Sequence, residues 1–214
     1  SRDCLDSKKI TFFTTGTVAL THPKLLKRIV DEGHEVACHY YFHDMMNTQS
    51  IKEIESNLVL AKNAISAACG VEPRGFRAPA FSIPNERLEV YELLSKHFVY
   101  DSSYILNTDI QSIDLLNSQY PFAKKDFIEL PIITYKWLKR FNIKSGGTFF
   151  RLFSLNIIKK VLKQSRKAGQ IPMIYLHPYD FLCKLEFKVP LSIFLKNHSI
   201  IYGTYKYLRQ FQWL

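Results

Sequence analysis

ITFFTTGTVALTHPKLLKRIVDEGHEVAC, residues 10–38, contains two short apolar segments separated by an amphipathic one. Residues 10–15 and 35–38 are rich in β-branched, aromatic and small apolar side chains, which predicts two strands. The segment between them begins at Thr21, a suitable N-cap, and ends at Gly33, with its apolar side chains on one face, which predicts a helix. Strands joined by a helical crossover pair in parallel, so this stretch predicts a parallel α/β fold.

The same alternation continues along the chain. Ser50 and Glu53 have the spacing of a capping box, and Gly70 follows the last apolar turn, which predicts a helix between them. The remaining predicted elements, in chain order, are a strand at 75–78, a helix at 84–97, strands at 98–103 and 127–132, a helix at 154–169 and a strand at 173–177. Residues 105–126 are irregular, and residues 182–214 form a C-terminal extension without a clear pattern.

Six strands alternating with helices predict most of a (β/α) barrel, formed by residues 1–214 as a single domain. A barrel of this kind places its active site at the carboxyl ends of its strands. The polar residues at those ends come from four different strands and are His39 with His43, Arg77, Asp101 and His177. His34 precedes its strand, so we expect it at the opposite end, with a structural role.

His39 and His43 lie four residues apart after the second predicted strand. Two imidazole nitrogens suit a zinc-like ion, and a catalytic site adds a third protein ligand and an open position for water. The alternative is that both are ordinary loop histidines, because this spacing alone is a weak motif. The pair indicates a metal site only in combination with the other polar residues at the strand ends.

Each of those other residues also has a structural alternative. Arg77 is either a fixed cation that holds a catalytic carboxylate or a surface arginine. Asp101 either orients a histidine or caps a turn, as Asp often does before Ser. His177 is either the general acid that protonates a leaving amine or a histidine packed in the core.

The chain carries a formal charge of +10, and its basic residues concentrate between Leu130 and Tyr179. This stretch contains ten Lys and Arg residues and no Asp or Glu. A solvated helix face explains such a run as well as a surface that meets an anionic partner, such as a membrane face or a phosphate-bearing substrate. Nucleic acid ranks lower as a partner, because the sequence contains no known nucleic-acid-binding module.

The four cysteines are Cys4, Cys38, Cys69 and Cys183, and no two of them form a CxxC pair. A thiolate zinc site is therefore not expected, and Cys38 is expected to be a buried thiol in an apolar strand. A reducing compartment is the simpler interpretation of this pattern. The chain has no apolar run of transmembrane length and no signal-peptide pattern, so we expect a cytoplasmic protein with peripheral contact at the inner membrane face.

GHEVACHYYFHD, GFRAPAFSI, YDSS and YLHPYD resemble four successive motifs of the NodB-type polysaccharide deacetylases, carbohydrate esterase family 4. These segments carry His39, His43, Arg77, Asp101 and His177 in the order of that family. SGGTFFRLFS, residues 145–154, resembles a glycine-rich stretch of the branch found in exopolysaccharide and O-antigen gene clusters. The resemblance extends from residue 10 to about residue 181.

The resemblance implies a distorted (β/α)7 barrel that hydrolyses an N-acetyl group on an amino sugar of a polysaccharide or lipid-linked glycan. It implies a divalent metal ion, zinc in most members, with His39 and His43 as ligands. It further implies that Arg77 positions the catalytic base and that His177 is the general acid, with Asp101 as the carboxylate behind it.

The family's first motif has no counterpart in this chain. That motif is a strand ending in two adjacent aspartates, which supply the base and the third metal ligand. Only nine residues precede Ile10, and Asp3 and Asp6 are neither adjacent nor preceded by an apolar strand. The resemblance therefore implies a barrel that lacks its first strand, which leaves the strand at 10–15 with an unpaired edge. We expect weak metal binding and little or no turnover from the chain as given.

Two other functions remain open. The same barrel would also suit hydrolysis of another C–N bond, by a deformylase or a small-amide hydrolase, which a substrate panel would separate. Alternatively, the chain is a non-catalytic glycan-binding or assembly module, which the missing aspartates favour. The set of His39, His43, Arg77 and His177 argues against that alternative, because a binding module has no need of a general acid.

Overall fold

The computed structural model describes residues 9–107, 127–137, 141–144, 146–147, 149, 153–167 and 173–178. The chain divides into two compact units. The first unit comprises Ser1–Ile105 and Asp114–Pro131, and the second comprises Leu106–Ile113 and Ile132–Leu214. The predicted extension at 182–214 and most of the predicted irregular segment lie outside the described residues.

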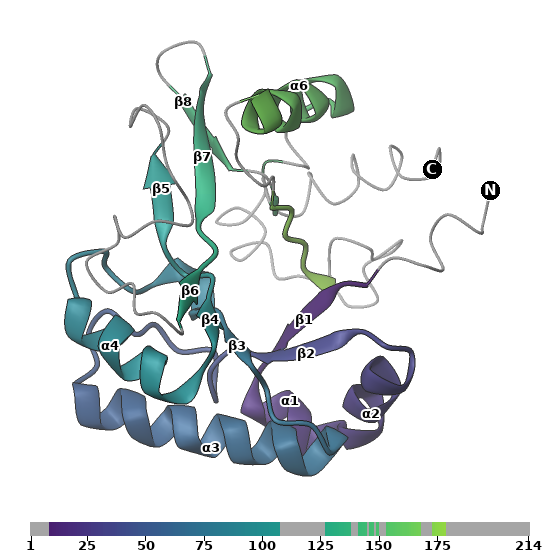
Figure 1. Ribbon diagram of the computed structural model, residues 1–214, viewed down its shortest axis with the longest axis vertical. Coiled ribbons are helices and arrows are strands. Elements are labelled where there is room, and N and C mark those ends of the chain that lie inside the picture. The colour runs from purple at the N-terminus through teal and green to yellow at the C-terminus, as the bar shows by residue number, and fades with distance from the viewer. Residues whose placement is uncertain are drawn as a thin grey trace, which may run out of the picture. The chain divides into compact units, whose positions relative to one another are not determined.

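The first unit contains a five-stranded sheet in the order β1-β2-β3-β4-β6 (Figure 1). The strands are β1 (Thr11–Thr14), β2 (Glu35–Cys38), β3 (Gly75–Phe76), β4 (Tyr100–Asp101) and β6 (Ile128–Glu129). All neighbouring pairs are parallel, as the alternation of strands and helices predicts. Within the described part of the chain, β1 pairs with β2 alone and lies at the end of the sheet order.

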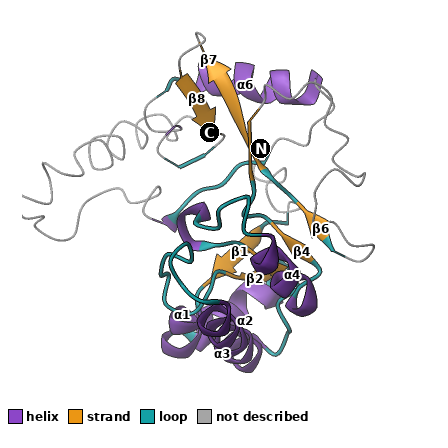
Figure 2. Cartoon of the chain, turned by 90° about the vertical axis from the view of Figure 1, so that its left-hand side faces the viewer, coloured by secondary structure: helices purple, strands orange, loops and turns teal. Residues whose placement is uncertain are grey.

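The helices of the first unit gather on one side of this sheet (Figures 1 and 2). They are α1 (Gly16–Thr21), α2 (Pro23–Asp31), α3 (Ile51–Cys69) and α4 (Leu88–His97). The capping box at Ser50 and Glu53 is confirmed, and Gly70 ends α3 with a φ of 76° in the left-handed region. The prediction that Thr21 caps a helix is wrong, because Thr21 is the last residue of α1 and His22 precedes α2 without a side-chain cap.

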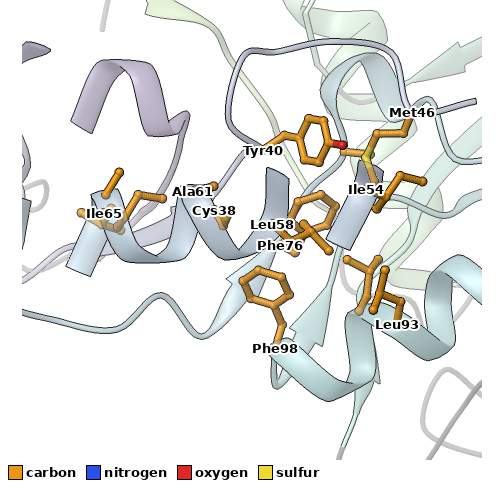
Figure 3. Close-up of a cluster of buried hydrophobic side chains, with 14 of the residues drawn as sticks. Cys38, Tyr40, Met46, Ile54, Leu58, Ala61, Ile65, Phe76, Leu93 and Phe98 are labelled. Carbon is orange, nitrogen blue, oxygen red and sulfur yellow. The ribbon is translucent and has the colours of Figure 1, made fainter. Parts of the chain in front are cut away.

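Side chains of α3 fill the interface between the helices and the sheet (Figure 3). Ile54, Leu58 and Ile65 of this helix are fully buried. They pack in one cluster with Phe76 of β3, whose ring centroid lies 5.3 Å from that of Phe98. Complete burial of one such side chain stabilises a fold by about 1.5–3 kcal/mol, so this cluster fixes the strand ends that carry the site.

The amino ends of three strands are joined by Glu35, the first residue of β2. Its carboxylate accepts hydrogen bonds from Tyr100 Oη at 2.9 Å and from Thr11 Oγ1 at 2.6 Å. The ring of Tyr100 crosses the sheet so closely that a Cβ at Gly75 would lie 1.9 Å from its Cζ. Only glycine fits at position 75 beneath this ring, which is the close backbone approach that a glycine within a strand often marks.

The second unit contains a three-stranded sheet in the order β5-β7-β8, and the sequence analysis missed most of it. Its strands are β5 (Ile105–Asn107, the first residue of which belongs to the first unit), β7 (Ile132–Trp137) and β8 (Phe141–Lys144). β7 and β8 are antiparallel. The single strand predicted at 127–132 is instead two strands, because β6 ends at Glu129 and β7 begins at Ile132.

The predicted helix at 154–169 is confirmed as α6 (Leu155–Lys167). The strand predicted at 173–177 is wrong for the described structure, in which Tyr175 forms only an isolated parallel bridge with Gly146. A Cβ at Gly146 would lie 2.2 Å from the carbonyl oxygen of Tyr175, so glycine is required for this contact. None of the helices described here is both long and apolar enough to span a bilayer.

Candidate metal and catalytic site

The loop after β2 carries the two histidines in a constrained backbone. Their ring centroids lie 5.0 Å apart with the ring planes at 74°. Tyr40 and His43 have φ angles of 69° and 67°, in the left-handed region that non-glycine residues rarely adopt. Strained backbone of this kind persists only where the surrounding structure enforces it, and it is common at active sites and ligand-binding loops.

The amino terminus of α1 enforces this loop conformation. Gly16 N–H donates to the carbonyl of Tyr40 at 2.9 Å, and Thr17 N–H donates to the carbonyl of Tyr41 at 3.1 Å. His39 N–H in turn donates to the carbonyl of Thr14 at 2.8 Å, which continues the β1–β2 pairing into the loop. The loop between the two histidines is therefore tied to β1 and α1 by backbone hydrogen bonds.

His39 is oriented by a hydrogen bond from its Nδ1 to the backbone carbonyl of Arg77, at 2.6 Å. A carbonyl oxygen can only accept, so Nδ1 carries the proton and the lone pair of the neutral ring is on Nε2. This is the arrangement found for metal-ligating histidines, in which a second partner fixes the tautomer and the ring plane. The contact supports the prediction that His39 is a metal ligand.

The guanidinium of Arg77 is held by the neighbouring strand. Arg77 Nε donates to the carbonyl of Ser102 at 3.2 Å, and Nη2 donates to Ser102 Oγ at 2.8 Å. The guanidinium also lies over the ring of Phe13, 4.1 Å from its centroid, in cation–π geometry. Arg77 is therefore a fixed cation whose carbonyl contacts His39, and its role in holding a catalytic carboxylate stays a prediction.

Asp101, at the end of β4, is completely buried. Its carboxylate accepts hydrogen bonds from the backbone N–H of Ser103 at 3.0 Å and from Ser103 Oγ at 2.7 Å. It therefore caps its own turn, as the structural alternative for this residue predicts. The same turn also fixes Arg77, because Ser102 Oγ accepts a hydrogen bond from its guanidinium.

Glu129 is a site residue that the sequence analysis missed. It lies beside Asp101 in the register of β4 and β6 and is 6% exposed. Side-chain burial alternates along this strand, since Phe127 is 4% and Ile128 is 48% exposed. Residues 127 and 129 share the inward face of the strand, which places a carboxyl group in the interior.

Burial dominates the electrostatics of this pair. It raises the pKa of Asp101 and raises the pKa of Glu129 well above its usual value, and the charge of Asp101 raises that of Glu129 further. Two adjacent buried carboxyl groups cannot both ionise at low cost, so the negative charge of one disfavours ionisation of the other. Burial also raises the pKa of the Cys38 thiol to about 12, which confirms the buried thiol predicted for the strand.

The structure brings His39, His43 and Arg77 together in the first unit, with Asp101 and Glu129 on the adjacent strands. His177 lies in the second unit, where its ring centroid is 6.1 Å from that of Tyr175, and its role as general acid stays a prediction. The two imidazoles fit a zinc-like ion. In the described residues, no group of three or more His, Cys, Asp or Glu side chains is placed to complete the ligand set.

Comparison with known proteins gives two family matches for this chain. Residues 5–99 match the family model of polysaccharide deacetylases, and residues 102–211 match the model of the domain of unknown function DUF3473, which covers more than half of the chain. The chain belongs to the DUF3473 family, and its amino-terminal part is similar to polysaccharide deacetylases. His39, His43 and Arg77 fall within the match to polysaccharide deacetylases, whereas Glu129 and His177 fall within the DUF3473 domain.

Two curated relatives of this amino-terminal part are a peptidoglycan deacetylase-like protein FGM2 from Gibberella zeae and a chitooligosaccharide deacetylase from Bradyrhizobium sp. (strain ANU 289). The first is 30% identical over 124 residues, which cover 56% of this chain and 35% of the relative. The second is 40% identical over 70 residues, which cover 32% of each protein. The matched parts therefore span about a third of the length of these relatives.

The fold is also similar to that of a presumed polysaccharide deacetylase from Mycobacterium smegmatis, known from its crystal structure. The TM-score is 0.54 at 23% sequence identity, over 78% of this chain and 56% of the other. This similarity supports the α/β fold of the amino-terminal part.

Proposed function

We propose that this chain hydrolyses the N-acetyl group of an amino sugar in a polysaccharide or lipid-linked glycan, with a divalent metal ion, zinc, held by His39 and His43. The observation that carries the proposal is the hydrogen bond from His39 Nδ1 to the carbonyl of Arg77, which presents the ring in the form that ligates a metal. Sequence similarity to proteins named as deacetylases of chitooligosaccharide and peptidoglycan supports the same reaction class.

A bound zinc ion would polarise the acetyl carbonyl and lower the pKa of an attacking water. Residues of the chain would position the base and supply the general acid. Arg77, fixed by Ser102, would position the carboxylate that acts as the base. His177 would protonate the leaving nitrogen of the sugar. The base and the third metal ligand are not assigned to any described residue.

Acetate release from N-acetylated amino-sugar oligomers tests this function. We expect release that depends on added zinc, that stops on chelation, and that is weak for the chain as given because the base is not among its described residues. An N-formyl substrate and a small amide serve as the comparison panel. Zinc-dependent release of formate without any release of acetate would contradict the proposal and favour a deformylase.

We propose further that the protein is cytoplasmic and meets an anionic membrane face through α6. Lys159, Lys160 and Lys163 are exposed on this helix, whereas Ile158 and Val161 are buried. Reversal of the three lysines to glutamate is expected to reduce binding to anionic lipid vesicles by about 3 kcal/mol, roughly 1 kcal/mol for each basic residue near the surface. Neutral vesicles are the control, and unchanged binding to anionic vesicles would refute this contact.

A further inference from the structure

A continuous set of hydrogen bonds links the candidate metal ligand to the buried acid pair. His39 Nδ1–H donates to the carbonyl of Arg77 at 2.6 Å, and the N–H of Ala78 donates to Ser103 Oγ at 2.8 Å. These two groups belong to the same peptide unit, between residues 77 and 78. The hydroxyl of Ser103 then donates to Asp101 Oδ1 at 2.7 Å, and Asp101 pairs with Glu129.

The direction of each hydrogen bond in this set is fixed. The backbone N–H of Ala78 can only donate to Ser103 Oγ, so the single hydroxyl proton of Ser103 is available to Asp101. Asp101 must therefore accept, which its ionised form does best. Hydrogen bonds in series polarise one another, so a negative charge on Asp101 strengthens the bond that His39 donates to the peptide carbonyl.

Glu129 decides whether Asp101 carries that charge. Among the described residues, its Oε2 has no hydrogen-bond donor, while Oε1 accepts from the backbone N–H of Tyr104 at 3.2 Å. Glu129 is the register partner of Asp101, so a proton on Glu129 would leave the negative charge of these two carboxyl groups on Asp101. Two other ionisable groups interact with these carboxyl groups, Arg77 directly after β3 and Tyr91 of α4.

We propose that Asp101 and Glu129 are positioning residues for the metal site, which act on His39 through Ser103 and the peptide unit between residues 77 and 78. The inference rests on the proposed function for the identity of the metal site. Metal-ligating histidines commonly donate their second N–H to a carboxylate or a carbonyl. Here the carbonyl and the carboxylate act in series, and Asp101 accepts hydrogen bonds from Ser103.

The zinc affinity of the full chain is the first measurement, made by competition with a chromogenic chelator and without any glycan. Ser103→Ala breaks the series while both carboxyl groups remain, and Asp101→Asn removes the charge. Each is expected to weaken zinc binding about 10- to 100-fold, the usual effect of losing an outer-shell partner.

Glu35→Gln is the matched control, because Glu35 is a carboxylate on the same sheet whose partners are Thr11 and Tyr100. Its replacement is expected to leave zinc affinity unchanged. Wild-type affinity in both Ser103→Ala and Asp101→Asn would overturn the proposal, as would an equal loss in Glu35→Gln.

Two measurements on the metal-free chain separate this inference from the proposed function. The Nδ1–H proton resonance of His39 is expected to shift upfield in Ser103→Ala, as its hydrogen bond weakens, and to stay in place in Glu35→Gln. The infrared spectrum is expected to show a protonated carboxyl band at neutral pH that Glu129→Gln abolishes. An unchanged His39 resonance in Ser103→Ala, or the absence of the protonated carboxyl band, would overturn this inference whatever the acetate assay shows. Failure of the acetate assay alone would overturn only the proposed function.

Discussion

A variant with His39 and His43 both replaced by alanine is expected to lose zinc binding and any acetate release. The wild-type chain would bind up to about one zinc ion, since the two imidazoles are the described part of a site that normally takes three protein ligands. Removing both takes away the two proposed imidazole ligands, so zinc content should fall to background. Metal analysis after dialysis, together with the acetate assay, measures the result.

The fold is expected to survive this double replacement. His43 is exposed and His39 half-buried, and the hydrogen bond from His39 to Arg77 contributes about 1 kcal/mol at most. Thermal unfolding should therefore show a small shift. The matched control is the double variant His22→Ala with His34→Ala, which removes the same number of imidazoles away from the loop. Equal zinc content in the two double variants would contradict the assignment of His39 and His43 as ligands.

The features that the sequence predicted well are local ones. Local residues determine where α3 starts and ends. The Ser50–Glu53 capping box accepts hydrogen bonds from the first backbone N–H groups, and Gly70 adopts the left-handed conformation that ends the helix. The parallel pairing of β1 with β2 follows from the crossover between them. In these segments local preference and tertiary structure agree.

The features that the sequence did not predict depend on contacts between distant residues. α1 is a short helix capped by Thr15 and has no apolar periodicity, so the sequence did not predict it. The pairing of β7 with β8 depends on cross-strand partners such as Thr134 and Lys144 rather than on a turn motif. Glu129 was missed for a similar reason, because its partner Asp101 is 28 positions away and only the strand register makes them neighbours.

The site itself was predicted in part. The spacing of His39 and His43 and the arginine after the third strand pointed to residues that the structure does bring together. The peptide unit that connects them to Ser103 leaves no pattern in the sequence, because any residue types supply a backbone carbonyl and N–H. A search for carboxyl residues at inward-facing strand positions would have found Glu129.

The buried pair also predicts how stability depends on pH. Burial raises the folded-state pKa of Glu129 above its ordinary value of 4.5. The folded state therefore binds more protons than the unfolded state between these two pKa values, and the free energy of unfolding falls as pH rises through this window. Each pKa unit of difference corresponds to about 1.4 kcal/mol, so even a modest shift gives a measurable slope.

Glu129→Gln is expected to flatten this dependence, because glutamine has nearly the same shape, donates a hydrogen bond to Asp101 and does not ionise. Below pH 4.5 the wild-type protein keeps its full stability from this group, and above the folded-state pKa the variant should be the more stable of the two. Denaturant unfolding at a series of pH values measures both curves.

Glu35→Gln, a carboxylate on the same sheet, is the control. It should not change the slope of unfolding free energy against pH that Glu129 causes. Parallel curves for the wild type and Glu129→Gln would show that Glu129 is already ionised in the folded protein. Two buried negative charges would then need a cation close by. The guanidinium of Arg77, directly after β3, is the cation that acts on Glu129.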